Sequence, residues 1–220
     1  MDEREKRDLR LWYDANNDPD AQSERLRCRQ LTHALNALDP ADEAERTRIL
    51  GQLLARIGEG TELLPPFQCD CGHLISIGRD SFVIYGAYFM DGGAITIGDR
   101  VYIGPNCGLY TAQHPLRWQE RNLGLERALP ITICDNCWLG GDVKVLPGVT
   151  VGEGCVIGAG SIVTRDVPAG MLAMGAPCRP IRPITEADSI FGSNEQRFGE
   201  SLQEPALSSV GLTDCRADVL

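Results

Sequence analysis

The hydrophobic positions at the start of the chain follow the period of a helix. Within residues 1–57, apolar side chains recur at spacings of three or four among charged ones, as in an amphipathic helix. The pattern is interrupted at residues 16–20 (NNDPD) and 39–42 (DPAD), where Asp and Pro are typical of a turn that leads into a helix. We therefore expect two or three short helices that cap the domain that follows.

From residue 74 onward the period of the hydrophobic pattern changes to six. The series shifts by two residues after Phe89 and is interrupted after Leu109. Its members are Ile77, Val83, Phe89, Ile97, Ile103, Leu109, Ile133, Leu139, Val145, Val151, Ile157, Val163 and Ala169. This period fits neither a helix nor a sheet with one solvent-exposed face. It is typical of a parallel β-helix, in which short strands stack coil on coil around a narrow core.

Two further places in each hexad support this prediction. A glycine often follows the apolar residue, and we expect it to supply the backbone freedom of a tight corner. These glycines are Gly78, Gly98, Gly104, Gly140, Gly152 and Gly158. The fifth place carries a small side chain, and its occupants are Ser81, Ala87, Val101, Cys107, Cys137, Val143, Val149, Cys155, Ser161 and Val167. The cysteines of this set are predicted to be packing residues, whereas Cys134 stands at a glycine place and is predicted to be a surface or corner thiol.

The interruption of the hexads predicts one extended loop, residues 111–130, that leaves the coil and returns to it. It begins with TAQHPL and carries His114, Trp118 and Glu126. Loops that leave a rigid scaffold are frequent sites of function. After residue 185 the pattern ends, and residues 186–220 are predicted to form a polar, poorly ordered tail.

Composition and charge exclude several classes of protein. A net charge of −10 without a long basic run argues against nucleic-acid binding. The hydrophobic residues, 43% of the chain, suffice for a folded core and argue against a disordered chain. No stretch approaches the roughly 20 apolar residues that span a bilayer. The first residues, MDEREKRDLR, lack the apolar core of a signal peptide. We therefore expect a cytoplasmic protein without a membrane segment.

The nine cysteines do not predict a metal site or a disulfide framework. Disulfide frameworks belong to small secreted chains, and nine leaves one cysteine unpaired. A zinc site built on Cys69 and Cys71 would need further ligands, and His73 is the one nearby candidate. We expect no metal cofactor.

Four motifs stand out when they are taken together: LWYDANND, TAQHPL, PITICDNCWLGGDVKVLPGVTVGEGCVIGAGSIVTRDVPAG and MGAPCRPIR. Their combination resembles the maltose and galactoside O-acetyltransferases, and the resemblance covers residues 8–185. It implies a mainly β protein with a helical maltose-acetyltransferase-like domain at residues 1–57 and a left-handed parallel β-helix at residues 58–185. It also implies a homotrimer that binds acetyl-CoA between neighbouring subunits and moves the acetyl group to a hydroxyl of a sugar or other small molecule.

The resemblance assigns catalytic roles to three residues of this chain. It implies that His114 is the general base that deprotonates the acceptor hydroxyl, and imidazole is suited to this near neutral pH. The main-chain N–H of Gly141, in WLGG, is implied as the donor that stabilises the oxyanion. Glu126 matches an acid common in the inserted loop and is expected to orient the imidazole through its other ring nitrogen.

The resemblance also implies a binding strip for acetyl-CoA. Ala159, Gly160 and Ser161 would border the pantetheine arm, and Trp138 is either a wall of the site or a large corner residue. The guanidinium groups near the end of the coil would meet the nucleotide phosphates, because arginine presents a planar set of donors. They belong to Arg165, Arg179 and Arg182.

The acceptor site is where this sequence departs from the family. Asp14 and Asp91 match acidic positions that contact the sugar, although Asp14 is equally suited to cap a helix. The family has asparagines where this chain has Ile84 and Gly86, and Tyr85, which lies between them, is expected to contact the acceptor. We therefore expect a pocket more apolar than one made for maltose or a galactoside, and an acceptor that is a less polar alcohol or an amine.

Two alternative functions compete with acetyl transfer. The loss of the two asparagines is consistent with a catalytically weak trimeric β-helix that serves in binding or assembly, although such a protein would not need His114. A metal-dependent carbonic anhydrase of the same fold would need three histidines on one zinc. The chain has three in all, and His33 falls in the helical region.

Overall fold

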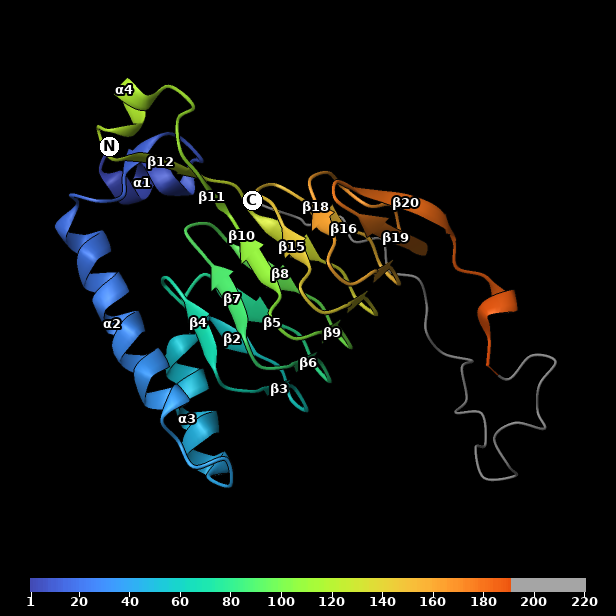
Figure 1. Cartoon of the computed structure of the whole chain (residues 1–220). Coiled ribbons are helices and arrows are strands. Elements are labelled where there is room, and N and C mark those ends of the chain that lie inside the picture. Colours follow the sequence, from blue (N-terminus) through green and yellow to red (C-terminus); the bar gives the residue numbers. More distant parts are fainter. Residues whose placement is uncertain (191–220) are drawn as a thin grey trace.

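The computed structural model describes residues 1–190, and its N-terminal part contains three helices and one very short strand (Figure 1). The helices are α1 (Glu3–Asp8), α2 (Pro19–Asn36) and α3 (Glu43–Leu53), and the strand is β1 (Tyr13–Asp14). An aspartate caps each helix, and Asp18, for example, accepts a hydrogen bond from the Ala21 N–H at 2.8 Å. Within residues 1–190, no helix combines the length and apolar composition needed to cross a membrane.

The rest of the described chain winds into a solenoid with three parallel sheets as its faces (Figure 1). The first sheet contains β2 (Arg56–Ile57), β5 (Ile75–Ile77), β8 (Ile95–Ile97), β13 (Ile131–Ile133) and β16 (Thr150–Val151). The second contains β4 (Phe67–Cys69), β7 (Ala87–Met90), β10 (Gly108–Tyr110), β15 (Lys144–Val145) and β18 (Ile162–Val163). The third contains β3 (Glu62–Leu63), β6 (Phe82–Val83), β9 (Tyr102–Ile103), β14 (Trp138–Leu139), β17 (Val156–Ile157) and β19 (Met171–Gly175). The strand β20 (Cys178–Pro183) closes this sheet antiparallel to β19.

The interior of the solenoid follows the six-residue pattern. Every predicted aliphatic position from Ile77 to Val163 is at most 1% exposed, and the small residues of the fifth place are also buried. One expectation was wrong. Ala169 is exposed, because the last coil is two residues shorter and Val167 takes the interior place beside Val151. Cys134, predicted to be a surface or corner thiol, directly follows β13 and is only 2% exposed, so it is a buried corner residue.

The glycines that follow the aliphatic residues are needed for a different reason than the expected one. They do not adopt the left-handed backbone conformation, which falls two residues later, for example at Arg100 and Asp142. A side chain is excluded at these positions because successive coils are in contact there. A Cβ atom on Gly98 would lie 2.1 Å from Asp135 Oδ1, and one on Gly140 would lie 2.7 Å from Ala159 N.

The helices pack against the first coils of the solenoid, beside β4 (Figure 1). Cys28 and Leu35 of α2 and Leu53 of α3 belong to the same buried cluster as Phe67. The Asn36 amide exchanges two hydrogen bonds of 2.9 Å with the main chain of Phe67. The first strand of the solenoid, β2, begins at Arg56, slightly before the domain boundary expected after residue 57.

The predicted loop at residues 111–130 has its own secondary structure. It contains β11 (Ala112–Gln113), α4 (Trp118–Arg121) and β12 (Leu125–Ala128). The strand β12 pairs with β11 on one side and with β1 on the other, which gives a small antiparallel sheet in the order β1-β12-β11. The loop is therefore joined to the N-terminal region. Of the predicted tail, Glu186–Asp188 form a 3-10 helix, η1, and residues 191–220 lie outside the described residues.

Candidate active site

The imidazole of His114 lies directly after β11 and is exposed to solvent. Its Nδ1 atom is 2.9 Å from the main-chain oxygen of Leu125 in β12. Because a carbonyl oxygen only accepts hydrogen bonds, Nδ1 must carry the proton in the neutral ring. The other nitrogen, Nε2, then has a free lone pair and can act as a base.

Glu126 does not make the contact that was expected of it. The ring nitrogen of His114 is bound by the Leu125 carbonyl, whereas Glu126 Oε1 accepts a hydrogen bond of 2.5 Å from the hydroxyl of Tyr13. The Glu126 side chain therefore extends toward Tyr13 in the N-terminal region. Leu125 and Tyr13 were not among the predicted site residues. A main-chain acceptor and a contact across 113 residues leave no signal in a single sequence.

The carboxylate of Asp14 binds main-chain groups of the turn that follows it. Asp14 does not cap a helix; the N-cap of α2 is Asp18. The Asp14 carboxylate accepts hydrogen bonds from the N–H of Asn16 at 3.2 Å and of Asn17 at 3.0 Å. The Asn17 side chain also donates to both carboxylate oxygens, and these bonds hold the pKa of Asp14 below its ordinary value. The turn lies beside β12, since Asp14 pairs with Leu125.

Asp91 is fully buried, so in the single chain its carboxylate is not open to an acceptor. Oδ1 accepts hydrogen bonds from the main-chain N–H groups of Asp70 at 3.0 Å and Cys71 at 2.8 Å. Oδ2 is buried and has no hydrogen-bond partner among the described residues. Burial raises the pKa of Asp91 to about 7, against the lowering effect of the two N–H groups. These contacts indicate a structural role in the turn at Asp70.

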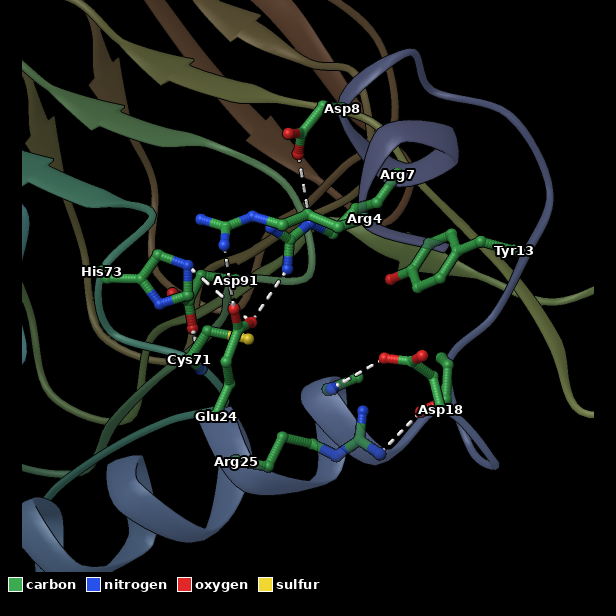
Figure 2. Close-up of polar contacts among 12 residues, drawn as sticks. Arg4, Arg7, Asp8, Tyr13, Asp18, Glu24, Arg25, Cys71, His73 and Asp91 are labelled. Carbon is green, nitrogen blue, oxygen red and sulfur yellow. Dashed lines mark hydrogen bonds and ion pairs between the residues drawn. The ribbon is translucent and has the colours of Figure 1, made fainter. Parts of the chain in front are cut away.

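A polar cluster surrounds Glu24 of α2 between the N-terminal helices and the solenoid (Figure 2). Its carboxylate is 3.1 Å from Arg7 Nη1, 3.9 Å from Arg4 Nη1 and 3.9 Å from His73 Nε2. Within residues 1–190, no group of three or more His, Cys, Asp or Glu side chains is arranged to hold a metal ion. The cluster therefore ties α1 and α2 to the first coils.

The outer face of the third sheet is apolar along several coils. Its outward side chains lie side by side in parallel register and are Phe82, Tyr102, Trp138, Val156 and Leu172. Trp138 and Tyr102 are each 55% exposed. The first sheet instead presents Ser76, Thr96, Thr132 and Thr150. One face of the solenoid is thus suited to contact an apolar partner, and Trp138 lies on it.

The corner after β14 offers main-chain donors. Within the part of the chain that the structure describes, no backbone hydrogen bond uses the N–H of Gly141, although its carbonyl accepts from Gly160 N at 2.9 Å. Ala159 and Gly160 are exposed on the next coil. Ser161 is buried, and its hydroxyl is bonded to the Gly158 carbonyl and to the Gly175 N–H. Only the first two of the three predicted pantetheine contacts are accessible.

The three predicted phosphate-binding arginines differ in their present contacts. Arg165 and Arg179 are exposed, and Arg179 donates to the adjacent carbonyl of Cys178 at 2.7 Å. Arg182 forms a bidentate pair with Asp188, at 2.6 and 2.7 Å. This pairing raises the pKa of Arg182 and lowers the pKa of Asp188 to about 2. A phosphate would have to displace Asp188 in order to bind Arg182.

Tyr85, the third predicted acceptor contact, lies at the corner after β6 and is 52% exposed. Its main-chain oxygen accepts a hydrogen bond from Asn106 N at 3.2 Å. Ile84 beside it is half-buried. The structure therefore brings together His114, Leu125, Tyr13 and Glu126, whereas Tyr85, Trp138 and Gly141 lie on the solenoid itself.

Comparison of the sequence with family models identifies both halves of this architecture. Residues 11–58 match the maltose acetyltransferase hexapeptide capping motif, and residues 130–165 match the bacterial transferase hexapeptide model. A protein assigned to the acetyltransferases in Saccharomyces cerevisiae is 45% identical over 177 residues, which is 80% of this chain and 90% of the relative. One from Staphylococcus aureus strain Mu50 is 49% identical over 84% of this chain and 92% of its own length.

Solved structures of acetyltransferases share the fold. A maltose O-acetyltransferase from Clostridium difficile 630 is 41% identical with a TM-score of 0.82, covering 84% of this chain and 99% of its own. A galactoside acetyltransferase in complex with coenzyme A is 35% identical with a TM-score of 0.83, covering 86% and 94%. A hexapeptide-repeat acetyltransferase from Vibrio cholerae complexed with acetyl coenzyme A is 35% identical with a TM-score of 0.78, covering 84% and 100%. The solenoid is the left-handed parallel β-helix of these enzymes, and the chain belongs to the maltose and galactoside acetyltransferase family of hexapeptide-repeat acyltransferases.

Proposed function

We propose that the protein transfers the acetyl group of acetyl-CoA to a hydroxyl of a sugar or other small molecule, with His114 as the general base. The observation that carries this proposal is the hydrogen bond between His114 Nδ1 and the Leu125 carbonyl, which leaves Nε2 free at an exposed position. A merely solvated histidine would need no such orientation. The presence of coenzyme A or acetyl coenzyme A in two related structures supports the choice of donor.

The reaction needs no covalent enzyme intermediate. Nε2 of His114 takes the proton of the acceptor hydroxyl while the oxygen attacks the thioester carbonyl carbon. The new C–O bond forms and negative charge develops on the carbonyl oxygen. When this tetrahedral species collapses, the C–S bond breaks and the leaving thiolate takes the proton from the imidazolium. The products are the acetyl ester and free CoA.

The N–H of Gly141 is the proposed donor to the oxyanion. It is not used in a backbone hydrogen bond within the described residues, and Gly141 is only half-buried. A main-chain donor that is fixed by the coil needs no reorganisation during the reaction, and one such donor is worth about 100- to 1,000-fold in rate. Trp138, on the same corner, would then border the thioester end of the donor.

The donor would lie along the apolar face of the third sheet, in a groove that a second subunit completes. A homotrimer would cover the exposed Tyr102 and Trp138, which a single solenoid leaves in water. The exposed Arg165 and Arg179 near the end of the coil would bind the phosphates, joined by Arg182 once Asp188 moves away. Sedimentation equilibrium should give three times the mass of one chain.

Calorimetric titration of the protein with CoA tests the donor site. We expect binding that weakens at least about tenfold in Arg179→Ala, since hydrogen bonds to charged groups contribute about 1.5–3 kcal/mol. The matched control is Arg29→Ala, which removes another exposed arginine, from α2, and should leave binding unchanged. Absence of any binding by the unaltered protein would instead favour a catalytically weak trimer with a structural role.

The acceptor is proposed to be less polar than maltose or a galactoside. The corner that the family fills with asparagines carries Ile84 and Gly86, and the exposed Tyr85 lies between them. An acceptor screen that measures thiol release should therefore favour alcohols and aryl or alkyl glycosides over free maltose. Amines belong in the same screen because the chemistry at His114 would also serve them.

A further inference from the structure

We infer that Tyr13 positions the imidazole of His114, acting through the strand β12. The inference rests on the proposed role of His114 as the base and assigns a catalytic purpose to the N-terminal strand. Tyr13 does not touch the reacting atoms. It holds the strand whose main chain orients the base.

The first step of the argument is the backbone register. In β1-β12-β11, Tyr13 lies opposite Glu126 and Asp14 lies opposite Leu125. The carbonyl that binds His114 Nδ1 therefore belongs to the residue next to the one that Tyr13 contacts. A displacement of β12 would move this carbonyl relative to the ring. The proton would then no longer be fixed on Nδ1.

The second step is the strength of the link between Tyr13 and Glu126. The Tyr13 hydroxyl donates to Glu126 Oε1 at 2.5 Å, and the Tyr13 side chain is only 5% exposed. Hydrogen bonds to ionised groups are about twice as strong as those between neutral groups. Burial and the charge of Glu126 raise the pKa of Tyr13, so the hydroxyl keeps its proton and remains a donor.

The third step is the space that two glycines leave for this arrangement. A Cβ atom on Gly92 would lie 2.9 Å from Glu126 Oε1 and 3.4 Å from the Tyr13 hydroxyl. A Cβ atom on Gly124 would lie 3.2 Å from Asp14 Oδ1, and Gly124 has a φ of +82°. A side chain at Gly92 would displace the Glu126 carboxylate, and one at Gly124 would be strained by the backbone conformation.

The fourth step concerns the other side-chain contacts between the N-terminal region and β12. The guanidinium of Arg127 lies 5.1 Å from the ring centre of Trp12, a cation–π contact at a partly exposed site. The β1 and β11 pairings of β12 each cover two residue pairs. Among the described residues, the hydrogen bond of Tyr13 is therefore the strongest side-chain contact between the N-terminal region and this strand.

The test compares two Tyr→Phe variants that each lose one hydrogen bond to a carboxylate. Tyr13→Phe removes the bond to Glu126, and Tyr88→Phe removes the 2.6 Å bond of the Tyr88 hydroxyl to Asp70 Oδ1. We expect kcat for acetyl transfer to fall about 10- to 100-fold in Tyr13→Phe, because small misplacements of a catalytic group have effects of this size. The KM for acetyl-CoA should not change. Tyr88→Phe should retain the kcat of the unaltered protein.

A second readout does not depend on activity. Long-range ¹H–¹⁵N spectra of the histidine rings, assigned with His114→Ala, should show a single Nδ1–H tautomer for His114 in the unaltered protein and in Tyr88→Phe. Tyr13→Phe should show a mixture of tautomers at a melting temperature that matches the Tyr88→Phe control. If both variants keep the same kcat and the same tautomer, the inference is overturned. If the unaltered protein has no transferase activity, the proposed function fails and the spectra alone decide the inference.

Discussion

Replacing Asp91 by asparagine should change how stability depends on pH. The carboxyl group is fully buried, and Oδ2 has no hydrogen-bond partner among the described residues. Burial raises the pKa of Asp91 from 3.8 to about 7 in the folded protein. An asparagine has nearly the same shape, and its carbonyl oxygen can still accept from the N–H groups of Asp70 and Cys71.

The sign of the effect follows from the two protonation states. Between pH 4 and 7 the folded protein keeps a proton on Asp91 that the unfolded chain releases, so stability falls as pH rises through this window. One unit of pKa corresponds to about 1.4 kcal/mol, which gives a total loss of about 4 kcal/mol above pH 7. About 3 kcal/mol of this loss falls between pH 5 and pH 8. The asparagine of the Asp91→Asn variant does not titrate, so this variant should not show the loss of stability.

Urea unfolding at pH 5 and pH 8, at one protein concentration, measures this difference. The free energy of unfolding of the unaltered protein should fall by about 3 kcal/mol more than that of Asp91→Asn. The control is Asp99→Asn. The main-chain N–H of Arg79 donates to Asp99 at 2.8 Å and holds its pKa below the ordinary value, so its difference from the unaltered protein should be the same at both pH values. If the free energies of unfolding of Asp91→Asn and of the unaltered protein differ by the same amount at both pH values, Asp91 is ionised in the folded state at both, which would contradict the reasoning.

Three further predictions concern stability and donor binding. Arg7→Met leaves Glu24 without its 3.1 Å partner in a mostly buried ion pair, and the free energy of unfolding in urea titrations should fall by about 3 kcal/mol. An unchanged free energy would mean that the pair contributes no more than a solvent-exposed ion pair. Gly98→Ala should lose about 1–3 kcal/mol, because its Cβ would meet the main chain of the next coil. Gly51→Ala in α3 is its control, has no atom within 4 Å of the added Cβ, and should gain up to about 1 kcal/mol. Asp188→Asn removes the carboxylate that occupies Arg182 and should tighten CoA binding a few-fold at low salt in calorimetry; weaker binding would contradict the role of Arg182.

The repeating part of the fold could be predicted because each coil repeats one local rule. Ile103 and Leu139 are interior for the same reason, and the structure buries both. The prediction failed near the end of the repeat, since the coil after Val163 is two residues shorter and Val167 lies beside Val151 where Ala169 was expected. The role of the glycines was also misjudged. A hexad pattern reports small size but does not say whether the backbone conformation or a neighbouring coil requires it.

The site could be predicted in part, and the limit is physical. The histidine stands out because an interruption of a regular pattern is visible in the sequence. The group that orients the imidazole is the main-chain carbonyl of Leu125. Every residue has such a carbonyl, so it cannot be recognised in the sequence, and the prediction relied on side-chain chemistry and chose Glu126. Tyr13 was hidden because it meets Glu126 only through the pairing of β1 with β12. Asp91 was predicted from the resemblance to contact the acceptor, and its burial in the single chain cannot be read from one sequence.

The central claim is that His114 is the base in acetyl transfer from acetyl-CoA. The most direct measurement is the release of free thiol from acetyl-CoA, with a responsive acceptor from the screen, by the unaltered protein and by His114→Ala, together with CoA affinity and oligomer mass for both. We predict a fall of at least about 100-fold in turnover for His114→Ala, since general bases contribute about 100- to 10,000-fold. CoA affinity and mass should be unchanged. Equal turnover by the two proteins, with intact CoA binding, would contradict the account.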